Sequence, residues 1–196
     1  WSKKRIRLSF NELRREQDLR SPHCYETDGF QVEKDDVLVD IGAAEGIFAL
    51  SNVEQAGRIV LFESSKEWIG PLKATFAPWK EKVEIVNKFA GDVTSAKCVT
   101  LDDYFSPEDK LSFLKIDVEG AESLLLSGCK RILSEEKPLK VAICTYHKDE
   151  DERELNETLK QNGFETSHSD GFLIIYTDRK LKAPYLRRGL IRAVKN

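Results

Sequence analysis

The sequence has few of the residues that mark a metal-binding, redox or membrane-spanning protein. It has no methionine, and its four cysteines, Cys24, Cys98, Cys129 and Cys144, lie far apart with no CxxC pair. We therefore expect neither a zinc site nor a redox motif. No apolar run reaches the roughly 18 residues of a membrane span, and no apolar stretch follows the basic start as in a signal peptide. These absences predict a cytoplasmic protein without a transmembrane segment.

Charge is distributed unevenly along the chain. The 196 residues carry a net charge of −3, but basic residues gather in the opening and closing stretches while acids lie between them. Basic ends can attract anionic partners. Neither end has the interleaved aromatic residues of a platform for single-stranded nucleic acid, so a nucleic-acid partner is disfavoured. The length suits one domain, 1–196, with a core at about 25–177 between a basic lead-in and a basic tail.

Short apolar runs alternate with helical patterns from Asp36 onward, which is typical of βαβ units. Parallel strands are predicted at 37–41, 58–62, 83–86, 111–116 and 140–144. Helices are predicted at about 47–53, 71–76, 120–133 and 149–162. Two last runs, 164–167 and 172–177, flank a short turn, so we expect them to pair antiparallel. The predicted class is α/β with a doubly wound, mainly parallel sheet.

The ends of the first two predicted strands carry residues that suit a nucleoside ligand. In open α/β sheets, ligands bind beyond the carboxyl ends of the strands. The first strand runs into the turn Asp40-Ile41-Gly42-Ala43-Ala44-Glu45-Gly46, and the second ends in Glu63, 21 positions after Gly42. An acid at about that distance accepts hydrogen bonds from both hydroxyls of a ribose. The two glycines could instead serve only to make a tight turn.

The same turn disfavours a dinucleotide. A GxGxxG turn would need glycines where Ala44 and Ile47 stand, so a pyrophosphate lacks its close approach to the backbone. Glu45 would also repel a pyrophosphate, whereas a ligand with an amino group and a sulfonium cation tolerates this acid. S-adenosylmethionine has both groups.

Three blocks resemble the FkbM family of S-adenosylmethionine-dependent methyltransferases. They are Asp40 to Gly46, then Thr100-Leu101-Asp102-Asp103, and then Lys115-Ile116-Asp117-Val118-Glu119-Gly120-Ala121-Glu122. The resemblance spans about 25–177. It implies a class I methyltransferase (Rossmann-like) fold with seven strands, the final one antiparallel, and transfer of a methyl group to a hydroxyl oxygen of a sugar, a polysaccharide precursor or a natural product.

The resemblance also implies a set of cofactor residues. The candidates are Asp40, Gly42, Ala43, Glu45, Gly46, Glu63, Ser64 and Asp117, with Asp92 as the acceptor for the adenine amino group. Many family members have an acid two positions before a histidine at the end of the fifth strand. This chain has Thr145 there, so His147 would act without that acid.

A general base should stand near the methyl group, because an alcohol is a poor nucleophile. Asp117 at the end of the fourth strand, His147 and Glu119 are the catalytic candidates, although Asp117 could only orient the cofactor and Glu119 could cap the next helix. Asp117, Glu119 and Glu122 could instead hold Mg²⁺. We favour chemistry without a metal.

Two other functions use a similar sheet. One is an NAD-dependent oxidoreductase, which the glycine turn disfavours, and the other is a non-catalytic module that only binds the cofactor. A nucleic-acid methyltransferase is disfavoured because Asp117-Val118-Glu119-Gly120 stands where an Asn/Asp-Pro-Pro-aromatic stretch would be expected. The sequence predicts neither the identity of the acceptor nor an oligomeric state.

Overall fold

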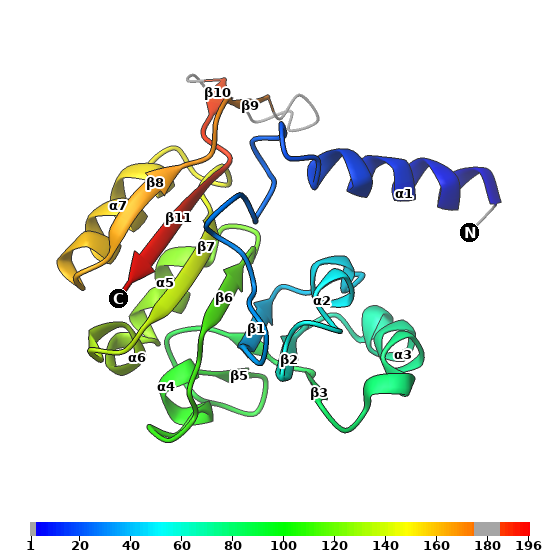
Figure 1. The fold of residues 1–196 in the computed structure, drawn as a ribbon, viewed down its shortest axis with the longest axis horizontal. Coiled ribbons are helices and arrows are strands. Elements are labelled where there is room, and N and C mark those ends of the chain that lie inside the picture. The colour runs from blue at the N-terminus through cyan, green and yellow to red at the C-terminus, as the bar shows by residue number, and fades with distance from the viewer. Residues whose placement is uncertain (1–2, 175–184) are drawn as a thin grey trace.

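Seven strands form one sheet in the computed structural model, which describes residues 3–174 and 185–196. The strand order is β3-β2-β1-β6-β7-β11-β8 (Figure 1). The strands are β1 Val37–Ile41, β2 Arg58–Phe62, β3 Val83–Val86, β6 Phe113–Ile116, β7 Leu139–Cys144, β8 Glu165–His168 and β11 Leu190–Lys195. Strand β11 is antiparallel to both of its neighbours, whereas the other neighbouring pairs are parallel. The sheet is therefore the predicted mainly parallel one with an antiparallel last strand.

The five predicted parallel strands are confirmed. Both faces of β1, β2, β6 and β7 are buried, which explains why their sequences read as continuous apolar runs. Helices cover both faces, so the doubly wound class is confirmed as well.

The prediction for the last strand pair was wrong. β8 pairs with β11, and the run that begins near Phe172 instead forms the short strand β9 Leu173–Ile174, which pairs with β10 Leu186–Arg187 outside the main sheet. The part of that run beyond Ile174 lies outside the described residues. Strand β11 comes from the basic tail, and its Leu190, Ile191 and Ala193 are fully buried. The tail thus completes the core.

Two hydrophobic layers hold the helices against the sheet. Val39 and Ile41 of β1 face one layer, and Leu38 faces the other. The first layer is covered by α4 Leu101–Tyr104, α5 Glu122–Ser127, α6 Lys130–Ser134 and α7 Asp151–Gln161. The second is covered by α2 Ile47–Ser51 and α3 Lys66–Thr75, with the 3₁₀ turn η1 Ala77–Trp79 after α3. The remaining strands, β4 Phe89–Ala90 and β5 Cys98–Val99, form a separate parallel pair.

Two helices differ from the prediction. The pattern at 120–133 contains two helices, α5 and α6, with Gly128 as the C-cap of α5 and Cys129 as the N-cap of α6. Gly128 lies against Gly91, and a β-carbon there would lie 1.9 Å from the Gly91 carbonyl oxygen. Helix α3 begins at Lys66 rather than at Pro71, so the proline lies inside the helix.

The N-terminal segment covers part of the second face of the sheet. Helix α1, Lys3–Glu16, has no buried residue and extends away from the body of the molecule (Figure 1). After it the chain returns to the sheet, where Tyr25, Phe30 and Val32 are buried against Leu38 and Phe113. This return brings the lead-in to the carboxyl ends of β6 and β7. Among the described residues, no helix is both long and apolar enough to cross a membrane.

Candidate active site

A cavity of about 330 Å³ opens at the carboxyl ends of β1, β2 and β6. It lies at the switch point of the sheet, since β2 and β6 flank β1 on opposite sides. Its lining includes the predicted residues Gly42, Glu63, Ser64, Asp117 and Glu119. The residues that the sequence placed at the ends of different strands thus line one cavity.

Gly42 makes the turn after β1 possible. Its φ is 76°, and a β-carbon there would lie 1.8 Å from the carbonyl oxygen of Asp117. The lack of a side chain thus allows the loop after β6 to lie against the loop after β1. Gly46 has a different structural role, because a β-carbon there would lie 2.7 Å from the Leu72 side chain of α3. It packs α2 against α3 and does not line the cavity.

Glu63 joins the loops that follow β1 and β2. Its carboxylate is 7% exposed, and it accepts hydrogen bonds from the backbone N–H of Ala44 (2.8 Å) and of Ser65 (2.6 Å). Asn87 holds the same loop by donating to the Glu63 carbonyl oxygen at 2.8 Å. A carboxylate oxygen accepts more than one hydrogen bond, so Glu63 can still bind ligand hydroxyls in the cavity.

The wall next to Glu63 is formed by the segment after β3. Lys88, Phe89 and Ala90 line the cavity, and Phe89 is 60% exposed. Asp92, the predicted adenine contact, is exposed and outside the lining, beside Gly128. An aromatic face at the cavity wall suits a flat heterocycle.

Asp40 lies beneath the cavity. Its carboxylate is fully buried and pairs with Lys115 of β6, with 3.0 Å between Lys115 Nζ and Asp40 Oδ1. Lys115 also donates a 2.7 Å hydrogen bond to the Gly42 carbonyl oxygen. Burial lowers the pKa of Lys115, but Asp40 and Asp117 outweigh it, so the pKa lies above its ordinary value and the ammonium stays charged. This buried pair fixes the glycine turn.

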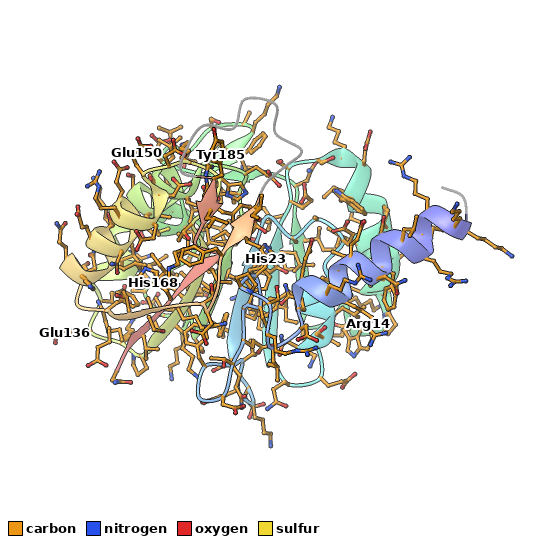
Figure 2. All side chains as sticks on the ribbon, turned by 90° about the horizontal axis from the view of Figure 1, so that it is seen from above. Arg14, His23, Glu136, Glu150, His168 and Tyr185 are labelled. Atoms are coloured by element: carbon orange, nitrogen blue, oxygen red, sulfur yellow. The ribbon has the colours of Figure 1, made fainter. Side chains whose placement is uncertain are left out.

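Asp117 is the centre of a polar cluster at the end of β6. The Tyr25 hydroxyl donates to its Oδ2 at 2.9 Å, and the Tyr146 hydroxyl donates to its Oδ1 at 3.4 Å. His23 hydrogen-bonds the Tyr146 hydroxyl at 3.0 Å and is labelled near the middle of the molecule in Figure 2. Burial raises the pKa of Asp117, but His23, Lys115 and His147 lower it well below its ordinary value. Asp117 is therefore a stable carboxylate and a weak base.

His147 does have a carboxylate partner. Its Nδ1 lies 2.9 Å from Oε1 of Glu122, a fully buried side chain at the start of α5. Glu122 thus replaces the acid that the sequence lacks at Thr145. Burial lowers the pKa of His147, but Glu122, Asp117 and Glu119 raise it above its ordinary value.

The remaining candidates lie apart from the cavity. Ala43 is buried in the core, and Glu45 lines a second, apolar hollow of about 520 Å³ between α1 and α3. Sequence reasoning missed Lys115, Tyr25 and His23 as site residues, and it considered Glu122 only as a cation ligand or a helix cap, not as the partner of His147. A lysine inside the otherwise apolar strand β6 was the available signal for Lys115, whereas nothing in the sequence links Tyr25 to Asp117, 92 positions away.

The strand order and the site at the switch point define a class I, Rossmann-like methyltransferase fold. A family model described as "Methyltransferase FkbM domain" matches residues 47–166. The chain therefore belongs to the FkbM methyltransferase family, and its cofactor is S-adenosylmethionine. This excludes the NAD-dependent alternative. No curated protein matches the sequence.

Solved methyltransferase structures share the fold at low sequence identity. An rRNA methylase from Streptococcus thermophilus is 15% identical (84% of this chain, 89% of that chain, TM-score 0.54). The C-terminal domain of precorrin-6Y C5,15-methyltransferase from Rhodobacter capsulatus is 13% identical (86% and 85%, TM-score 0.57). Fibrillarin from Aeropyrum pernix, with natively bound S-adenosyl-L-methionine, is 16% identical (83% and 67%, TM-score 0.53). Ribosomal RNA and precorrin-6Y are chemically different acceptors, so the fold alone does not define the acceptor.

Proposed function

We propose that this methyltransferase transfers the methyl group of S-adenosylmethionine to a hydroxyl oxygen of a small-molecule or saccharide acceptor. The observation that carries the proposal is a wall of Asp117, Glu119 and His147, called the acid–imidazole wall from here on. Asp117 and Glu119 line the cavity, and His147 Nε2 lies 3.5 and 3.6 Å from their carboxylate oxygens. Such a wall can take up the proton that a hydroxyl loses on methylation.

The residues of the cavity fit the cofactor. Glu63 presents a carboxylate to which the two ribose hydroxyls can donate, and Phe89 offers its face to the adenine ring. The amino group and the sulfonium are cationic, so they suit the end of the cavity where Asp117 lies. The cofactor supplies an activated methyl group when it is bound.

The reaction needs alignment and removal of one proton. Bound S-adenosylmethionine would supply an activated methyl group and a neutral sulfide leaving group, so the protein would have to hold the acceptor oxygen against the methyl carbon and exclude water. The hydroxyl proton passes to the acid–imidazole wall. Asp117 has a lowered pKa, so its part is to hold the wall in place, and the proton is taken on the side of Glu119 and His147.

The proposal is tested with methyl-labelled S-adenosylmethionine and a panel of acceptors. The panel contains oligosaccharides, polyhydroxylated natural products and RNA, because an rRNA methylase shares the fold. We expect label in a methyl ether of a hydroxylated small molecule or saccharide, and at least a hundredfold slower transfer by Asp117→Asn and His147→Ala. Label only in RNA bases, or only on carbon or nitrogen, would contradict O-methylation.

A further inference from the structure

The imidazole of His147 has a buried nitrogen that lacks a partner. The side chain is 10% exposed, and neither ring nitrogen makes a hydrogen bond of good geometry with a described residue, although Nδ1 lies 2.9 Å from Glu122 Oε1. Nε2 points between two carboxylate oxygens, Asp117 Oδ1 at 3.5 Å and Glu119 Oε2 at 3.6 Å. An unpartnered buried polar atom is costly, so this arrangement calls for a group that is missing from the protein alone.

Glu122 determines which nitrogen of His147 carries a proton. Glu122 Oε1 is held by the backbone N–H groups of Val118 (3.1 Å) and Gly120 (3.4 Å), and it lies 2.9 Å from His147 Nδ1. A carboxylate beside Nδ1 keeps the proton there and leaves the lone pair of Nε2 free. Without a cation, the three carboxylates around His147 favour its protonated form, in which Nε2–H faces Asp117 and Glu119. A cation would replace that proton, and Nε2 and the two carboxylate oxygens would then be three ligand atoms facing it.

The two carboxylates are available on that side. Asp117 Oδ2 accepts the hydrogen bond from Tyr25, so Oδ1 is the oxygen that faces His147. The Glu119 side chain is 90% exposed, and the left-handed backbone of Glu119 (φ 54°) turns the chain at the cavity mouth. Cys144 and His23 also lie near Asp117, but a thiol is a soft ligand and does not suit a hard cation that prefers oxygen.

We propose that Asp117, Glu119 and His147 bind one divalent cation of the Mn²⁺ or Mg²⁺ type, with Glu122 orienting His147 from behind. Adjacent ligands of an octahedral ion about 2.1 Å away lie about 3 Å apart. The two distances from His147 Nε2 are about half an ångström longer, and the Glu119 side chain, which is 90% exposed, would have to move toward the other two ligands to close the site. Two carboxylates and one imidazole, with room for water at the cavity mouth, suit these cations.

The cation would add a second role to the site of the proposed function. This part of the inference rests on that function, because it assumes that the acceptor carries a hydroxyl group. A hydroxyl that binds the cation becomes more acidic and is held next to the methyl group. With the cation bound, Nε2 of His147 would be a ligand and would accept no proton, so the hydroxyl proton would leave through Glu119, the member of the wall most exposed to water. The deprotonated oxygen would then accept the methyl group. The cation favours acceptors with two neighbouring hydroxyls, which can both bind it.

The test measures the cation directly, without cofactor or acceptor. The full-length protein is stripped with a chelator and titrated with Mn²⁺, and free Mn²⁺ is followed by electron paramagnetic resonance. We expect one Mn²⁺ per chain, displaced by excess Mg²⁺. Binding should weaken at least tenfold in His147→Ala and in Glu119→Gln, and 10- to 100-fold in Glu122→Gln. Glu150→Gln, which removes another exposed carboxylate at the start of α7, is the matched control and should bind like the wild type.

The outcomes separate this proposal from the proposed function. Glu119 is exposed, so its variant keeps the fold, and a thermal melt checks the His147 and Glu122 variants. No bound Mn²⁺ in the wild type, or equal binding by wild type and Glu119→Gln, overturns the cation site and leaves O-methylation standing. Site-specific Mn²⁺ binding without methyl transfer to any hydroxyl supports the site and contradicts the proposed function.

Discussion

Lys115 Nζ lies 3.0 Å from Asp40 Oδ1, and the side chains of both residues are almost completely buried. A charge this deep in the sheet needs its partner, because removing one member leaves the other uncompensated. The same lysine holds the Gly42 carbonyl oxygen. The pair therefore links the stability of the sheet to the shape of the cofactor turn.

Replacing Lys115 alone should destabilise the protein strongly. We expect Lys115→Met to lower the free energy of unfolding by about 3–5 kcal/mol, since Asp40 remains buried without a partner. The double variant Asp40→Asn, Lys115→Met should lose less than Lys115→Met alone. Urea unfolding measures both, and equal losses would contradict the pairing.

Gly42 should not tolerate a side chain. Gly42→Ala places a β-carbon against the Asp117 carbonyl oxygen at a positive φ, so we expect a loss of at least about 1–3 kcal/mol and of cofactor binding. Gly70→Ala is the control, because nothing lies within 4 Å of a β-carbon there and its φ is ordinary. Because Gly70 lies in helix α3, Gly70→Ala should raise the free energy of unfolding by about 0.5–1 kcal/mol. Thermal unfolding distinguishes the two, and similar effects would refute the steric argument.

Arg192 of strand β11 connects the tail to the site. It donates hydrogen bonds to the carbonyl oxygens of Cys24 (2.7 Å) and Tyr25 (3.1 Å), and so holds the segment that presents Tyr25 to Asp117. Arg192→Ala should lower the free energy of unfolding by about 1.5–3 kcal/mol. It should also slow methyl transfer. Arg14→Ala, on the exposed helix α1, should change neither quantity, and an equal effect of both variants would argue against this role.

The ion pair of Arg58 and Asp109 should stabilise the protein in a pH-dependent way. Burial raises the pKa of Asp109, but the Ser106 backbone N–H and Arg58, 2.6 Å away, lower it below its ordinary value. A depressed carboxyl pKa stabilises the fold above about pH 4, and this stability is lost as the pH falls through the folded pKa. Asp109→Asn should cost about 0.2–1 kcal/mol at pH 7, and the difference from wild type should shrink below pH 4. A difference that grows in acid would contradict the assignment.

The sequence predicted those parts of the fold that depend on local patterns. The strands 37–41 and 58–62 were predicted because both of their faces are buried. The position of Gly42, Glu63 and Asp117 around one cavity was predictable because the carboxyl ends of parallel strands meet at one edge. Strand β11 was missed because Arg192 and Lys195 interrupt its apolar residues, so it resembled a solvated tail. The contact of Tyr25 with Asp117 depends on the path of the lead-in across the sheet, and no local pattern encodes that path.

The central claim is that the cavity beside Glu63 binds S-adenosylmethionine, and calorimetric titration of wild type and Glu63→Gln tests it most directly. We expect S-adenosylmethionine and S-adenosylhomocysteine to bind at one site and NAD not to bind. Glu63→Gln should bind the two adenosyl ligands at least tenfold more weakly, because hydrogen bonds to a charged group contribute about 1.5–3 kcal/mol. Glu67→Gln, the same change on the exposed side of α3, should bind like the wild type. No adenosyl binding by the folded wild type, or unchanged affinity in Glu63→Gln, would contradict the account.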